Sequence, residues 1–295
     1  MTDEEGEFDD KEYLFYQTPP GMRFDEAESE GLSEKEYALE TLERYSGSKA
    51  SDFQSNLLLT NFPHYVEKFA EKTGSEIFEG AMFKVCHWKE KRISMIDFKI
   101  GSPAAALVVD LCSFLPTNAA LLLGMCGGLR RRYKVGDYLI PVAGIRDEGT
   151  SDYYFPGEVP ALSNFLVIRS IIETLESQKI PHHIGITFTT NKRFWEFNET
   201  FKTRLKATRA QAIEMECATL FMASYARKFS LGALLLISDL PLNRTGIKTK
   251  KMSKHVFENF MEMHINAGID IILHAEMLLR HRAKGIYNRE RYDKK

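Results

Sequence analysis

Short apolar runs alternate with longer amphipathic segments along most of the chain. Short runs rich in aliphatic residues predict buried strands, whereas apolar residues that recur every three or four positions predict helices. We expect strands near residues 56–60, 81–88, 92–98, 119–124, 135–143, 182–190 and 232–239, and helices within residues 61–74, 102–115, 162–177, 216–229 and 251–282. This alternation predicts an α/β fold in which a mixed sheet lies between helices.

The beginning of the chain differs from the rest in composition. Residues 1–36 contain 13 acidic and 3 basic side chains, and the pair Pro19-Pro20 disfavours a regular element there. We therefore expect residues 1–32 to form an acidic segment that is flexible or loosely docked, and residues 33–295 to form a single domain. Ser33 and Glu36 have the spacing of a capping box, which predicts that a helix begins at this point.

Composition and charge restrict the class of protein. No apolar run approaches the roughly 20 residues that a helix needs to cross a bilayer. The acidic amino-terminus has no apolar signal core, so we expect a cytoplasmic protein with no membrane partner. The formal net charge is −2 although residues 1–36 carry −10, so the remainder is mildly basic. This excess suits a small anionic ligand and is too weak to indicate binding to nucleic acid.

The cysteines and histidines do not indicate a metal site. The four cysteines are far apart and form no CxxC pair; they are Cys86, Cys112, Cys126 and Cys217. We expect them to be reduced thiols. The adjacent histidines His182 and His183 lack the spacing of metal ligands as well, and the GxSxG motif of a serine nucleophile is missing.

Small residues follow the predicted strand at residues 119–124. The segment GMCGG, Gly124–Gly128, precedes three arginines, Arg130–Arg132. It has neither the GK[ST] ending of a P-loop nor the GxGxxG spacing of a dinucleotide fold. Taken alone, it is consistent with a ligand that approaches the backbone or with tight packing. The arginines are consistent with an anion site or with a solvated turn.

Two other segments bring carboxylates to the ends of predicted elements. In AIEMECATLF, Glu214 and Glu216 flank Met215 where an extended segment passes into a helix. One carboxylate can enter a pocket and bind two sugar hydroxyl groups while the other supports the backbone; alternatively, both favour the helix dipole. In LLLISDLP, a buried strand delivers Asp239 to its end. Burial favours the protonated form of a carboxyl group, so Asp239 suits a general acid, or it caps a turn.

The segment TTNKRFWEF, Thr189–Phe197, combines aromatic and basic side chains at a strand end. Phe194 and Trp195 can stack on a flat base beside Arg193, which can bind an anion. Such an aromatic pair is equally consistent with the core.

Together, GMCGGL, TTNKRFWE, AIEMECATLF and LLISDLP occur in the order and spacing of a known group of enzymes. From about Leu57 to the carboxyl-terminal helix, the chain resembles the nucleoside phosphorylase and nucleosidase superfamily, and within it the AMP nucleosidase family. The resemblance implies a single catalytic domain with a twisted mixed sheet, partly closed into a barrel and flanked by helices in three layers. It also implies a homo-oligomer based on dimers, up to a hexamer, and no cofactor or metal.

The resemblance assigns roles to individual residues. Met215 and Glu216 match the pair that lines the ribose, with the glutamate on the 2′ and 3′ hydroxyl groups. Asp239 matches the aspartate that protonates the purine at N7. Cys126 and Gly127 match the segment beside the sugar and the base.

The resemblance also indicates candidates for stacking on the base and for binding a 5′-phosphate. Phe194 and Trp195 lie near the position of the aromatic residue that stacks on the base. Arg193 and Lys248 are the candidates for binding a 5′-phosphate.

The phosphorylase branch of the superfamily binds inorganic phosphate at positions that match Asn61, Tyr65, Leu122 and Met125 here. Leu and Met offer neither charge nor hydrogen-bond donors to a phosphate dianion, and burying that charge unpaired would cost several kcal/mol or more. We therefore expect water rather than phosphate to attack the sugar.

The expected activity is hydrolysis of AMP to adenine and ribose 5-phosphate, with a small-molecule nucleotide as the partner. One alternative is a phosphorylase or nucleosidase that acts on an unphosphorylated purine nucleoside. Another is a non-catalytic nucleotide-binding regulator, which the presence of both Glu216 and Asp239 disfavours because binding alone does not require an acid.

Overall fold

A computed structural model of the chain describes residues 32–243, 246 and 249–283. The predicted acidic segment, residues 1–32, lies outside the described residues except for Leu32. The chain divides into two compact units, residues 1–37 and residues 38–295.

The predicted helix start is confirmed at Ser33. The Ser33 N–H group donates to Glu36 Oε2 over 2.8 Å, and the Glu36 N–H group donates to Ser33 Oγ over 3.3 Å. These are the two reciprocal bonds of a capping box, and helix α1 (Glu34–Ser46) begins at the next residue.

The second unit is built on a ten-stranded mixed sheet. Its strands are β1 (Asn56–Thr60), β2 (Ile77–Glu79), β3 (Lys84–Trp88), β4 (Ile93–Asp97), β5 (Ala119–Gly128), β6 (Tyr138–Asp147), β7 (Ala161–Leu162), β8 (His182–Thr190), β9 (Ala212–Glu214) and β10 (Leu231–Asp239). Strands β5, β10, β6, β8 and β9 form a closed ring, because β5 pairs with both β10 and β9. From β5 the sheet continues through β1, β4, β3 and β2, while β7 pairs with β6.

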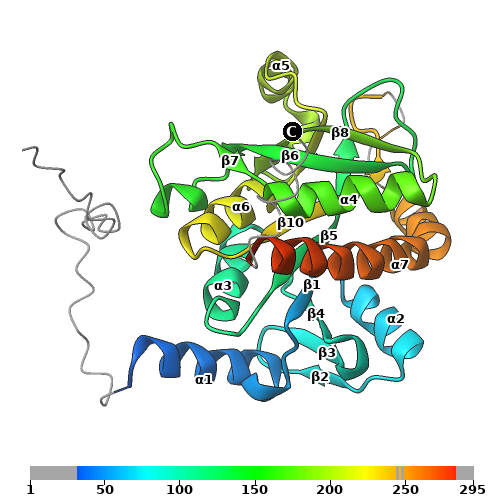
Figure 1. The fold of residues 1–295 in the computed structure, drawn as a ribbon. Coiled ribbons are helices and arrows are strands. Elements are labelled where there is room, and N and C mark those ends of the chain that lie inside the picture. Colours follow the sequence, from blue (N-terminus) through cyan, green and yellow to red (C-terminus); the bar gives the residue numbers. More distant parts are fainter. Residues whose placement is uncertain (1–31, 244–245, 247–248, 284–295) are drawn as a thin grey trace, which may run out of the picture. The chain divides into compact units, whose positions relative to one another are not determined.

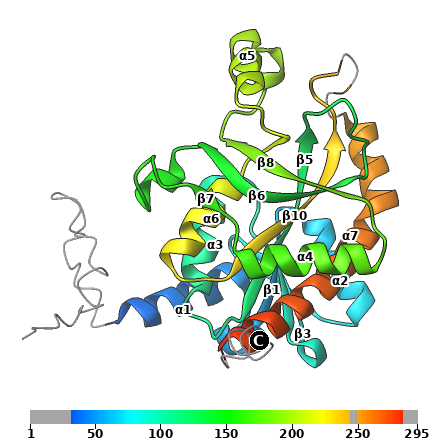
Figure 2. The same ribbon diagram turned by 45° about the horizontal axis from the view of Figure 1, so that its top comes forward.

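Helices cover this sheet on two sides (Figures 1 and 2). They are α2 (Pro63–Thr73), α3 (Ser102–Cys112), α4 (Phe165–Ser177), α6 (Cys217–Ala226) and α7 (Lys250–Ala283). Helix α5 (Glu199–Ala207) projects beyond the end of β8 and lies next to the 3₁₀ turn η5 (Trp195–Phe197). The other short 3₁₀ turns are η2 (Ala50–Asp52), η3 (Lys89–Lys91) and η4 (Thr150–Tyr153). One apolar cluster joins α3 and α6 to the sheet, and a second joins α2, α4 and α7 to it. The predicted three-layer α/β fold with a partly barrel-like mixed sheet is thus confirmed.

Several predicted elements are confirmed with small changes of boundary. Strand β8 spans the predicted residues 182–190, and the strands predicted near 81–88 and 92–98 are β3 and β4, which pair antiparallel. Helix α5 was not predicted, because its apolar positions are few. Its start is nevertheless marked by Asn198, whose side chain accepts a hydrogen bond from the Phe201 N–H group.

The glycine-rich segment after the predicted strand at 119–124 belongs to the strand itself. Strand β5 continues to Gly128, and all ten of its residues are buried. Barrel closure explains the small residues: a Cβ atom on Gly124 would lie 3.0 Å from Leu235 of the adjacent β10, and one on Gly128 would lie 3.0 Å from Ile237. The glycines therefore allow two strands of the ring to pack closely.

In the part of the chain that the structure describes, no helix combines the length and hydropathy needed to cross a membrane.

Candidate functional site

A cavity of about 240 Å³ opens where several strands end. Strands β1, β5 and β10 run parallel to one another, and their carboxyl ends meet the ends of β8 and β9 at this point. The carboxyl ends of strands are also where open α/β sheets bind their ligands. The lining residues are Asn61, Phe62, Ile100, Met125, Cys126, Gly127, Thr190, Lys192, Arg193, Trp195, Glu196, Ile213, Glu214, Met215, Glu216, Ser238, Asp239 and Pro241.

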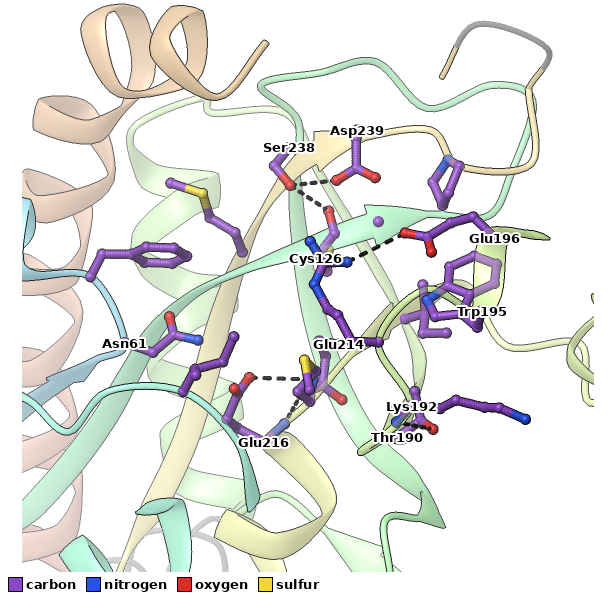
Figure 3. Close-up of a pocket in the computed structure, with 18 residues that line it drawn as sticks. Asn61, Cys126, Thr190, Lys192, Trp195, Glu196, Glu214, Glu216, Ser238 and Asp239 are labelled. Carbon is purple, nitrogen blue, oxygen red and sulfur yellow. Dashed lines mark hydrogen bonds and ion pairs between the residues drawn. The ribbon is translucent and has the colours of Figure 1, made fainter. Parts of the chain in front are cut away.

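The cavity brings together most of the residues that the sequence analysis singled out (Figure 3). Asp239, Glu216, Met215, Cys126 and Gly127 all line it, although β5, β9 and β10 are far apart in the sequence. Figure 3 shows Asp239 and Glu216 on different sides of one pocket, which leaves the space between them for a ligand.

Glu214 supports the backbone beneath this site, as one of the two predicted alternatives required. Its Oε2 atom accepts hydrogen bonds from the N–H groups of Glu216, over 2.7 Å, and Cys217, over 2.6 Å. The Thr189 hydroxyl donates to its Oε1 atom. Glu214 thereby fixes the first turn of α6 and the position of Glu216 before it. Burial raises the pKa of Glu214, and these hydrogen bonds oppose that rise.

Glu216 is the carboxylate that faces the cavity. It is buried, with 4% of its surface exposed. Its Oε1 atom accepts a hydrogen bond from the Gly101 N–H group over 2.8 Å. Burial, together with the negative charge of Glu214, raises the pKa of Glu216 to about 7. Near neutral pH this carboxyl group can therefore change its charge, which is unusual for a glutamate.

Asp239 lies at the end of β10 beside Ser238. The Ser238 hydroxyl donates to Asp239 Oδ1 over 2.6 Å, and the Cys126 carbonyl oxygen lies 3.3 Å from the same Ser238 oxygen. Strand β10 has a register shift between Ile237 and Asp239 where it pairs with β5. This irregularity ends the strand next to the cavity, and Asp239 remains 7% exposed there.

The two aromatic residues at the end of β8 have different positions. Trp195 is buried and lines the cavity, whereas Phe194 is 77% exposed and does not line it. Phe194 adopts a left-handed backbone conformation with φ 62°. This turn directs the next residue, Trp195, inward, so the structure brings only the second member of the pair to the cavity.

Of the two residues predicted to bind a 5′-phosphate, the structure describes only Arg193. Arg193 lines the cavity and its Nη1 atom lies 3.4 Å from Glu196 Oε1. Lys248 lies outside the described residues. The arginines at 130–132 are not among the residues that line the cavity.

Gly127 lies at the cavity, but packing explains its small size. A Cβ atom at this position would lie 2.9 Å from Pro241, which itself lines the cavity. Tight packing, one of the two interpretations left open by the sequence, therefore applies at Gly127, where the loop after β10 approaches the strand.

Of the four positions that the resemblance predicted to match phosphate ligands of the phosphorylase branch, two line the cavity: Asn61 and Met125. Tyr65 is fully buried and its hydroxyl hydrogen-bonds to His264 Nδ1 over 2.8 Å. Leu122 is buried in the cluster that contains α3 and α6. Asn61 Oδ1 is buried without a hydrogen-bond partner among the described residues.

Glu196, a buried acidic residue of η5 that lines the cavity, was not predicted as a site residue. Its position in the sequence next to Trp195 did not indicate burial, because a single glutamate in a polar loop is usually exposed.

Within the described residues, no group of three or more His, Cys, Asp or Glu side chains is arranged to hold a metal ion.

The chain is similar to known proteins over most of its length. A family model described as the phosphorylase superfamily matches residues 57–273. The AMP nucleosidase of Escherichia coli K12 is 26% identical over 283 residues, which cover 80% of this chain and 58% of that protein. The present chain thus matches less than two thirds of that relative's length. The uridine phosphorylase of Thermococcus kodakarensis is 27% identical over 205 residues, which cover 64% of this chain and 74% of that protein.

Among solved structures, the crystal structure of an AMP nucleosidase from Bacteroides thetaiotaomicron is similar with a TM-score of 0.73 and 36% sequence identity. The match covers 85% of this chain and 100% of that chain.

Proposed function

Since the chain belongs to the phosphorylase superfamily, we propose that it hydrolyses the N-glycosidic bond of AMP and releases adenine and ribose 5-phosphate. The observation that carries the proposal is that Asp239 and Glu216 line one cavity from different sides. The similarity to AMP nucleosidases supports the choice of AMP as the substrate.

In this proposal Asp239 is the general acid. Cleavage of the bond leaves negative charge on the purine, and a proton delivered to N7 neutralises it. General acid catalysis of this kind contributes roughly 10²–10⁴ in rate. The Ser238 hydroxyl, 2.6 Å from Asp239 Oδ1, stabilises the carboxylate that remains after proton transfer.

Glu216 binds the sugar. In its ionised form it accepts hydrogen bonds from the 2′ and 3′ hydroxyl groups. The same negative charge stabilises the positive charge that develops on the sugar as the bond breaks. Met215 packs beside the ribose, Trp195 stacks on the base, and Arg193 supplies positive charge for the 5′-phosphate.

Water is the attacking group in this proposal. Met125, which is 7% exposed at the cavity, offers no charge to inorganic phosphate. Asn61, at the end of β1, lies close enough to Glu216 for its side chain to lower the pKa of that carboxyl group by hydrogen bonding. Its buried Oδ1 atom remains as an acceptor, and it orients the water molecule on the sugar side of the cavity.

The test is to incubate the full chain with AMP in phosphate-free buffer and to separate the products by chromatography. We expect free adenine and ribose 5-phosphate, at a rate that added inorganic phosphate does not increase. A strict requirement for phosphate, with a sugar 1-phosphate as product, would indicate a phosphorylase. Cleavage of adenosine but not of AMP would refute the nucleotide substrate.

A further inference from the structure

Glu196 is an acidic side chain buried at the cavity with a weak ion-pair partner. Its side chain is 8% exposed, and its Oε1 atom lies 3.4 Å from Arg193 Nη1, whose side chain is 55% exposed. A carboxylate removed from water needs strong hydrogen bonds to offset the loss of hydration. One long contact to a half-exposed guanidinium group leaves Glu196 with unused acceptor capacity.

The position of Glu196 relates it to Asp239 rather than to Glu216. In Figure 3, Glu196 and Asp239 lie on the same side of the pocket, while Asn61 and Glu216 lie on the opposite side. In the proposed function Asp239 faces N7 of the purine. Glu196 therefore lies beside the purine edge that contains N7 and the substituent at position 6.

The substituent at position 6 distinguishes two classes of purine at this edge. Adenine presents N7 as an acceptor and its 6-amino group as a donor, whereas a 6-oxopurine presents two acceptors, N7 and O6. A carboxylate next to the acid accepts a hydrogen bond from the amino group. The same carboxylate repels a carbonyl oxygen, because neither group has a proton to donate.

We propose that Glu196 is the specificity-determining residue that selects 6-aminopurine over 6-oxopurine substrates, by accepting a hydrogen bond from the 6-amino group. The inference rests on the proposed function, because it places the purine by the role of Asp239. It adds the chemical class of the base to that function.

A different role for Glu196 would be to hold Arg193 in place for the 5′-phosphate. The two roles differ in a measurable way. Loss of a phosphate-binding geometry lowers activity on AMP and on IMP by the same factor, because both carry the same phosphate. Loss of the contact to the amino group changes the ratio between them.

The test is the substitution Glu196→Gln, which keeps the shape of the side chain and lets its amide group donate a hydrogen bond to O6. We expect the ratio of kcat/KM for AMP to that for IMP to fall by tenfold or more, since a hydrogen bond to a charged group contributes a factor of this size. The matched control is Glu199→Gln, an exposed glutamate three residues further on, which leaves the ratio unchanged. A fall of less than tenfold in the Glu196→Gln ratio, including an equal loss on both substrates, overturns the inference.

A binding measurement separates this inference from the proposed function. The Kd values of free adenine and hypoxanthine are measured by calorimetry for the unchanged chain and for Glu196→Gln. The ratio of these constants moves toward hypoxanthine by tenfold or more if Glu196 contacts the base. This result stands even if the chain proves to need phosphate, whereas an unchanged ratio refutes the role of Glu196 even if AMP is hydrolysed. If Glu196→Gln does not fold, Glu196→Asp serves instead, and it must weaken adenine binding by tenfold or more without strengthening hypoxanthine binding.

Discussion

The Ser238 hydroxyl donates a hydrogen bond to Asp239 Oδ1 over 2.6 Å, at the carboxyl end of β10. A hydroxyl group has one proton to donate, and the Cys126 carbonyl oxygen, at 3.3 Å, is the second acceptor within reach. The shorter contact directs this proton toward Asp239 when Asp239 is ionised. The pair thus couples the proposed acid to a group that stabilises its conjugate base.

The substitution Asp239→Asn tests the acid itself. An amide cannot deliver a proton to N7, so we expect kcat for AMP to fall by roughly 10²–10⁴ while KM changes little. Steady-state kinetics over a range of AMP concentrations measures both constants. Asp270→Asn, at an exposed position of α7, is the matched control. An increase in KM with kcat unchanged would show that Asp239 serves binding and not proton transfer.

Removing the hydroxyl group by Ser238→Ala should lower kcat for AMP by roughly ten- to a hundredfold, because the carboxylate left after proton transfer loses a charge-assisted hydrogen bond. The same kinetic assay measures this effect. Ser170→Ala is a suitable control, since Ser170 is also buried and donates to the Val167 carbonyl oxygen within α4. Unaltered turnover in Ser238→Ala would contradict the coupling to Asp239.

The role of Glu216 can be tested with a substrate that lacks one of its partners. We expect Glu216→Gln to lower kcat/KM for AMP by roughly ten- to a hundredfold, and to lower kcat/KM for 2′-deoxy-AMP less, because the deoxy sugar has already lost one of the two hydroxyl contacts. Parallel assays with the two nucleotides give the comparison, with the exposed residue variant Glu40→Gln as the control. Equal losses on both nucleotides would argue against binding of the 2′ hydroxyl group by Glu216.

The raised pKa of Glu216 predicts a cost to stability at alkaline pH. Burial and the charge of Glu214 raise this pKa from 4.5 to about 7. Below pH 4.5 the group is neutral in the folded and unfolded states. Between pH 4.5 and about 7 the unfolded state loses its proton first, so the folded state loses stability as the pH rises.

Replacing this carboxyl group by an amide removes that cost. Glu216→Gln should therefore increase the free energy of unfolding at pH 8 by on the order of 1–3 kcal/mol and should have little effect at pH 4. Urea unfolding at the two pH values measures the difference, and Glu40→Gln should show none. A variant that is less stable than the unchanged chain at pH 8 would contradict the direction of the pKa shift.

Gly144 allows β6 to lie close to α6, the helix that begins after Glu216. A Cβ atom at position 144 would lie 2.9 Å from Ala218 Cα and 3.0 Å from Ala218 Cβ. We expect Gly144→Ala to lower the free energy of unfolding by roughly 1–3 kcal/mol through overpacking, as measured in urea. Gly157→Ala has no atom within 4 Å of the added Cβ and should be nearly neutral. Similar stabilities of the two variants would mean that α6 moves away at little cost.

The sequence by itself determined the type and the order of most elements, and it identified the family. Each strand or helix displays its buried face in the spacing of apolar residues, so the boundaries of β8 and the buried strand that ends at Asp239 follow from local pattern alone. The spacing of Glu214 and Glu216 does not separate their roles by itself, because residues two apart on an extended segment point to the same side. The two carboxylates diverge because β9 ends at Glu214 and Glu216 adopts a non-extended backbone conformation before α6.

The tertiary structure alone decided which distant side chains meet. Closure of the ring between β5 and β10 sets the glycines of β5 against Leu235 and Ile237, which no local pattern records. The backbone turn at Phe194 selects Trp195 for the cavity and buries Glu196 beside it. Local sequence reports whether a residue prefers water or the interior, whereas the contacts of a buried polar group depend on segments that are far away in the chain. For this reason the sequence pointed to Asp239 and Glu216 as candidates for the acid and the sugar-binding carboxylate, whereas Glu196 was recognised only in the structure.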